Sequence, residues 1–67
     1  MLFDVYGRYR VYVDADRMPW LVDGDGGRSS IQGFAIPPDA DGEEMIDLLD
    51  VAFHEYARPG DKVIRIS

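Results

Sequence analysis

Apolar residues recur at the spacing of an α-helix in only one part of this chain, between Asp41 and Ala57. Side chains three and four residues apart lie on one face of a helix, so this spacing predicts an amphipathic helix. That face holds Met45, Leu49, Ala52, Phe53 and Tyr56, with Ile46 and Leu48 at its flanks. A single helix must bury its apolar face against another layer, and the rest of the chain therefore has to supply a sheet.

Both ends of the predicted helix carry residues that start or stop helices. Asp41 is followed three residues later by Glu44, which is the spacing of a capping box, and Asp39 is an alternative cap. Arg58-Pro59-Gly60 comes after the helix. Because proline cannot continue a helix and glycine readily reverses the chain, we expect the helix to end here.

Before the helix, the chain alternates polar and apolar residues, as half-buried strands do. Residues 2–14 alternate throughout, and we interpret them as one strand with Gly7 at a bulge or sharp twist. Shorter strands are expected at Met18–Asp23 and from Arg28 to about Ile36. After the helix, Lys62–Ile66 predicts the last strand.

Turn residues separate these strands. Asp14–Arg17, followed by Pro19, predicts one turn, and Gly24–Gly27 predicts a hairpin because glycine and aspartate tolerate positive φ. The order β-β-β-α-β predicts an α+β fold. We expect a small antiparallel sheet of three to four strands, with one amphipathic acidic helix packed on one face, as a single domain over residues 1–67.

The chain has 67 residues and no cysteine, so disulfides cannot stabilise its small core. Apolar residues make up 46% of it, which argues against intrinsic disorder. We expect no signal peptide and no membrane span, because no apolar run approaches about 20 residues. These features favour a soluble cytoplasmic protein, in whatever cell it works.

Most of the net charge is concentrated in the predicted helix. Between Asp39 and Glu55 there are seven acidic residues and no lysine or arginine. The remaining six acids are balanced by the seven basic residues elsewhere, so the net charge of −6 is a local feature. Such acidity disfavours direct binding to nucleic acid or anionic membranes and favours a basic partner.

Helical geometry places Glu43, Asp47 and Asp50 opposite the apolar stripe. Neighbours on this face lie about 5–6 Å apart, close to the separation of phosphates along a nucleic-acid strand. Like charges at this spacing repel, and no lysine in the helix relieves them. The predicted partner-binding surface comprises Glu43, Asp47, Asp50, Glu44 and Asp39. The alternative is a solvated face that only keeps the protein soluble.

If the helix covers one face of the sheet, the other face is free for a partner. The strand predicted over residues 2–14 places Tyr6, Arg8, Arg10 and Tyr12 there in a row. Tyrosine and arginine are enriched at binding hot spots, which makes this row an alternative protein interface. Such side chains also stack on RNA bases, although the net charge disfavours RNA here. In the simplest alternative, the arginine stems merely cover the tyrosine rings.

No residue pattern predicts an enzyme. His54 is the only histidine, and the chain offers no nucleophile paired with a base. The segment Asp23-Gly24-Asp25-Gly26-Gly27 resembles the start of a calcium loop, but Phe34 occupies the position where an EF-hand needs glutamate. We therefore expect no catalytic residue, no metal site and no cofactor.

Three segments resemble a family of small bacterial proteins of unknown function. They are Tyr6-Gly7-Arg8, Ile36-Pro37-Pro38 and the segment from His54 to Asp61. The likeness spans most of the chain, but it implies no activity.

By size, acidity and architecture, the chain is also similar to the small acidic anti-CRISPR proteins of phages and mobile elements, several of which are DNA mimics. This resemblance implies a non-enzymatic inhibitor or decoy, a monomer or weak homodimer, that binds a basic nucleic-acid-binding protein. A Cas subunit of a CRISPR surveillance complex is one such partner. The resemblance carries no motif and transfers no residue role. The alternative is an accessory or antitoxin-like interaction module that uses the sheet face.

Overall fold

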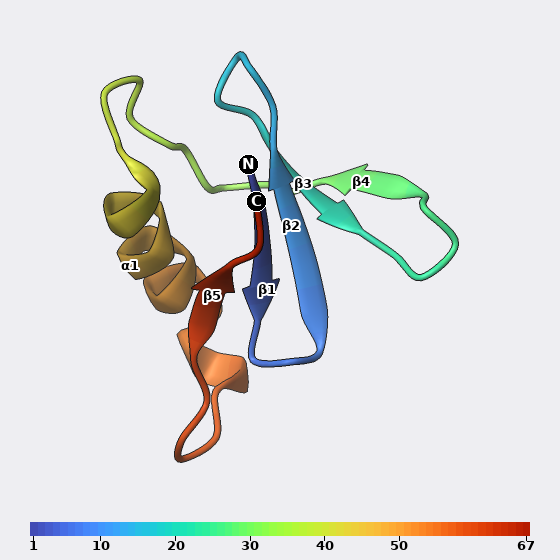
Figure 1. The fold of residues 1–67 in the computed structure, drawn as a ribbon, viewed down its shortest axis with the longest axis vertical. Coiled ribbons are helices and arrows are strands. Elements are labelled where there is room, and N and C mark those ends of the chain that lie inside the picture. The colour runs from blue at the N-terminus through green and yellow to red at the C-terminus, as the bar shows by residue number, and fades with distance from the viewer.

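An antiparallel sheet of five strands carries one α-helix across one of its faces (Figure 1). The computed structural model describes residues 1–67. The elements are β1 (Leu2–Val5), β2 (Tyr9–Val13), β3 (Pro19–Val22), β4 (Arg28–Ser30), α1 (Gly42–Ala52), the 3-10 turn η1 (His54–Tyr56) and β5 (Val63–Arg65). The strand order is β4-β3-β2-β1-β5. The predicted α+β class is confirmed, with five strands in place of three to four.

The prediction of a single first strand is wrong, because these residues form the β1–β2 hairpin. Tyr6 and Gly7 have positive φ angles of 61° and 71°, and the Arg8 N–H donates to the Val5 carbonyl at 3.1 Å. Gly7 therefore belongs to a tight turn rather than to a bulge. The register pairs Val5 with Tyr9, so paired residues share the same parity. The polar–apolar alternation consequently runs through the turn without a break.

The third predicted strand ends earlier than expected. β4 stops at Ser30, and Gly33 turns the chain with a φ of 70°. The chain then crosses toward α1 (Figure 1), and Ile36 is buried in the core. Ile31 and Phe34 pack against the same core, so this segment contributes apolar side chains to the core from outside the strands.

At its start, α1 has the predicted cap. The Asp41 carboxylate accepts the N–H of Glu44 at 2.9 Å, so Asp41 rather than Asp39 is the cap. The helix ends at Ala52, earlier than predicted, and the chain continues as η1. With 11 residues, α1 is too short to cross a membrane, and no other helix of the structure is long and apolar enough to do so.

The core lies between α1 and one face of the sheet. Met45 and Leu49 of α1 are fully buried. The other buried members are Phe3, Val5, Tyr6, Val11, Val13, Ile36, Ala40 and Val63. Because alternate strand residues point to opposite faces, the even-numbered residues of β1 and β2 lie on the face away from α1. No helix covers that second face (Figure 1).

Replacing the cap residue tests the start of α1. Asp41→Ala removes the acceptor for the Glu44 N–H, and we expect a loss of about 1 kcal/mol of unfolding free energy. In a domain of this size, that loss lowers the Tm by about 4–8 °C in a thermal melt followed by circular dichroism. Asp39→Ala is the matched control, because Asp39 makes no capping hydrogen bond. Equal shifts in the two variants would contradict the assignment of the cap.

Candidate functional site

The acidic surface of α1 has no basic neighbour that pairs with it. Glu43, Glu44 and Asp47 are all exposed. The one salt bridge of the structure joins Arg8 to Asp61, so no acid between residues 39 and 55 forms an ion pair. The helix surface therefore presents carboxylates without an ion pair to solvent, although the Arg65 side chain lies against Gly42 at the start of α1. We call Glu43, Glu44 and Asp47 the acidic face.

Asp50 is not part of this unpaired set. The Tyr6 hydroxyl donates to the Asp50 carboxylate at 2.6 Å. Because Tyr6 is only 5% exposed, this hydrogen bond joins the β1–β2 turn to the last turn of α1 from within the core. Burial, followed by the hydrogen bond to Asp50, raises the pKa of Tyr6 to about 12. Asp50, which was predicted only as part of the partner-binding surface, therefore has a structural role.

The predicted row of four residues on the open sheet face does not form, because the turn separates its members. Tyr6 lies in the core, and Arg8 donates to the Asp61 carboxylate at 3.0 Å and to the Tyr56 carbonyl at 2.7 Å. Only Arg10 and Tyr12 remain on the face away from α1. The interface predicted there loses half of its residues.

Other side chains take their place on the open sheet face. The register sets Trp20 opposite Tyr12 and Val22 opposite Arg10, and the Arg28 guanidinium lies 4.6 Å from the centre of the Tyr12 ring. This open sheet face, defined by Arg10, Tyr12, Trp20, Val22 and Arg28, combines aromatic and cationic groups. The sequence places Trp20 and Val22 at one parity of a strand, but only the pairing register reveals that they join Tyr12.

Asp14 holds Trp20 in place at the end of the hairpin. The Trp20 indole N–H donates to the Asp14 carboxylate at 2.9 Å, and the Met18 N–H donates to its other oxygen. These two donors, with the indole first, lower the pKa of Asp14. The indole N–H is therefore bonded within the protein, while the ring remains partly exposed.

Asp61 organises the chain between η1 and β5. Its carboxylate accepts the Arg58 N–H at 2.7 Å as well as the Arg8 guanidinium. The backbone donor and then Arg8 lower the pKa of Asp61. Two of the three segments that carry the family resemblance meet in space here and have a structural role. Arg8 belongs to one of them, and Tyr56, Arg58 and Asp61 belong to the other.

The glycine-rich turn that resembled a calcium loop uses its first carboxylate within the turn. Asp23 accepts the N–H groups of Asp25 and Gly27 at 3.0 and 2.8 Å. No cluster of three or more histidine, aspartate or glutamate side chains forms a potential metal site in the structure. His54 lies just beyond α1, is exposed, and makes no side-chain hydrogen bond.

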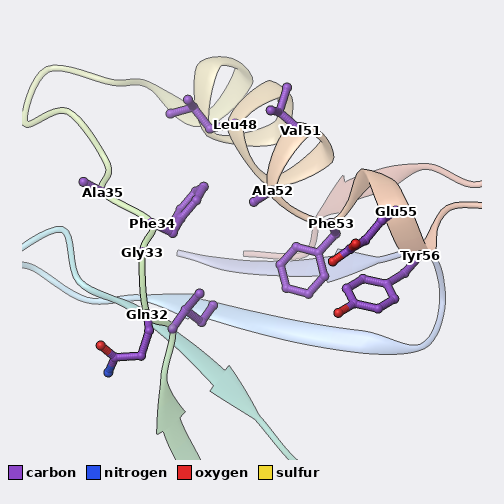
Figure 2. A pocket seen from close by; sticks show the side chains of 11 residues that line it. Gln32, Gly33, Phe34, Ala35, Leu48, Val51, Ala52, Phe53, Glu55 and Tyr56 are labelled. Carbon is purple, nitrogen blue, oxygen red and sulfur yellow. The ribbon is translucent and has the colours of Figure 1, made fainter.

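Sequence reasoning missed an apolar groove beside α1. It has a volume of about 540 Å³ and lies between residues 31–35 and the last turns of the helix with η1 (Figure 2). Phe34 projects from one side toward the helix, and Leu48, Val51 and Ala52 come from the other. Its two walls are distant in sequence, and one of them was predicted to be a strand. No local pattern could therefore reveal it.

The chain belongs to a family described as Domain of unknown function (DUF7661), whose model matches residues 1–67. No curated protein and no solved structure matches the chain. What the protein does must therefore be inferred from its own surfaces.

The Tyr6–Asp50 hydrogen bond predicts a specific response to alkaline pH. Because the folded pKa of Tyr6 lies above its ordinary value of 10.0, its contribution to stability is complete below about pH 10 and is lost as pH rises toward 12. In Tyr6→Phe the Tm should fall less steeply across this range, as measured by circular dichroism in a pH series. Tyr12→Phe, whose hydroxyl makes no hydrogen bond within the protein, should keep the wild-type slope. An unchanged slope in Tyr6→Phe would contradict the assignment.

Proposed function

We propose that this DUF7661 protein is a non-enzymatic binding protein whose acidic face pairs with a basic nucleic-acid-binding protein, acting as an inhibitor or decoy. The observation that supports this most is the lack of any salt bridge to the acids of α1, although seven basic residues are present in the chain. The acidic face is left free for lysine and arginine side chains of another molecule.

Repulsion within α1 supports the same proposal. Glu43 and Asp47 are four residues apart, and like charges at this spacing cost a helix about 0.2–0.5 kcal/mol. A partner's cations would relieve that repulsion. They would also be attracted over a distance, so association is fast at low salt and weakens as salt screens the charges.

The spacing of the carboxylates supports the choice of partner. Charges about 5–6 Å apart on a helix resemble the run of phosphates along a nucleic-acid strand. A protein that holds phosphates with a basic channel would therefore accept the acidic face in their place. Several of the small acidic anti-CRISPR proteins that this chain resembles act in this way on CRISPR surveillance complexes, which makes a Cas subunit a specific form of the proposal.

A second candidate function uses the open sheet face. The exposed Arg10 and the Arg28–Tyr12 contact place cationic and aromatic groups beside a half-buried Trp20. Such residues dominate the binding energy of protein interfaces. This surface supports an accessory or antitoxin-like module, or a weak homodimer.

Charge reversal separates the two candidates. Glu43→Lys with Asp47→Lys should abolish retention of basic proteins from a bacterial lysate on the immobilised protein, and duplex DNA should displace those proteins from the wild type. Asp16→Lys with Asp25→Lys makes the same change in net charge at exposed turns away from α1 and should retain them. If the helix double variant keeps the same partners at low salt, the acidic face is not the binding surface. Loss of those partners in Arg10→Ala with Arg28→Ala alone would favour the open sheet face.

A further inference from the structure

We infer that the groove beside α1 docks an amphipathic helix of a partner protein, one that places an apolar anchor in the groove and basic residues at its rim. This inference rests on the proposed function, because both require a basic partner. The groove inference adds that the partner contributes apolar as well as cationic side chains. A basic channel that binds only phosphates would not need apolar side chains.

The groove has the size and lining of a binding site. Its volume of about 540 Å³ lies within the roughly 300–1,000 Å³ of ligand pockets. Phe34 faces Leu48 and Ala52 across it, and Phe53 and Tyr56 line the end near η1 (Figure 2). These side chains offer a continuous apolar surface to one or two inserted side chains.

Two residues of the groove are unusually exposed. Val51 is 77% exposed and Tyr56 is 53% exposed, although both line the groove. Neither belongs to the buried core. Val51 points away from the core stripe of α1 and makes the rim of the groove apolar (Figure 2). Covering such an apolar rim with a partner removes apolar surface from water, which favours binding.

The charged side chain that lines the groove is acidic. Glu55 is the only charged residue that lines it, and no lysine or arginine does so. Glu44, Leu48, Val51 and Glu55 follow one another at helical spacings, so two acids flank two apolar residues on this side of α1 and η1. The charge of Glu55 also raises the pKa of the neighbouring Tyr56. An occupant with basic residues on either side of its anchor complements this arrangement.

The same charges disfavour a second copy as the occupant. Another copy carries a net charge of −6, and its own groove is lined by the acidic Glu55. Bringing two such surfaces together adds repulsion at low salt. A cationic amphipathic helix avoids this cost, and helices commonly bind grooves through apolar residues at i, i+3, i+4 and i+7.

A synthetic leucine/lysine amphipathic helical peptide tests the inference directly. It is titrated into isotope-labelled protein while backbone amide shifts are recorded by NMR, and a leucine/glutamate peptide of the same pattern is the charge control. We expect the largest shifts at residues 31–35 and 48–56 with the lysine peptide. Val51→Ser should weaken binding of the lysine peptide by about tenfold. Val51→Leu, which keeps an apolar side chain at the rim, should bind this peptide as the wild type does. Ile64→Ser, which truncates another exposed aliphatic residue on the opposite face, should leave binding unchanged.

The outcomes distinguish this inference from the proposed function. Shifts centred on Glu43 and Asp47, with binding unaffected by Val51→Ser, would overturn the groove inference while supporting the acidic face. Equal binding of the glutamate peptide, or no binding of the lysine peptide, would overturn the inference as well. A dimer in sedimentation that Val51→Ser abolishes would assign the groove to a second copy and overturn it. Failure of the proposed function is judged separately, by the charge-reversal variants.

Discussion

Hydrogen bonds join the β1–β2 turn to the C-terminal part of the chain. They come from the side chains of Tyr6 and Arg8 and from the Tyr6 backbone. The Tyr6 hydroxyl donates a hydrogen bond to the Asp50 carboxylate, and the Tyr6 backbone N–H donates to the Lys62 carbonyl at 3.0 Å. The Arg8 guanidinium donates to the Asp61 carboxylate. In a domain with few core residues and no disulfide, these contacts position α1 and β5 against the hairpin. Tyr6 and Gly7 have positive φ angles and form the tight turn between β1 and β2. This turn places the Tyr6 and Arg8 side chains at the same end of the hairpin.

The same contacts divide the acidic residues into two groups. Asp41, Asp50 and Asp61 accept hydrogen bonds that hold α1 or the segment before β5 in place. Glu43 and Asp47 accept none and remain exposed. The fold therefore uses some of its negative charge internally and leaves the acidic face of α1 without an ion pair. Leu48, which lines the apolar groove, directly follows Asp47 in the chain, so both surfaces belong to α1.

The sequence predicted the parts of this structure that depend on local patterns. The helical spacing of Met45 and Leu49 and the cap at Asp41 led to α1 and to the α+β class. The hairpin was missed because a turn that pairs Val5 with Tyr9 keeps the parity of the alternation. The role of Asp50 was missed because its partner is 44 residues away in the sequence. The groove and the open sheet face likewise depend on contacts between segments, which no local pattern encodes.

The division of the acids is tested most directly by the thermal stability of single carboxylate-to-amide variants. Asp50→Asn and Asp61→Asn weaken hydrogen bonds within the fold, so we predict a lower Tm for both. Asp47→Asn removes repulsion within α1, so we predict an unchanged or higher Tm. Glu43→Gln removes the same repulsion but also a favourable interaction of the first turn with the helix dipole, so we predict a change in Tm smaller than that of Asp50→Asn. A fall in Tm for Glu43→Gln or Asp47→Asn as large as that for Asp50→Asn would contradict the claim that the acidic face is free of structural duties.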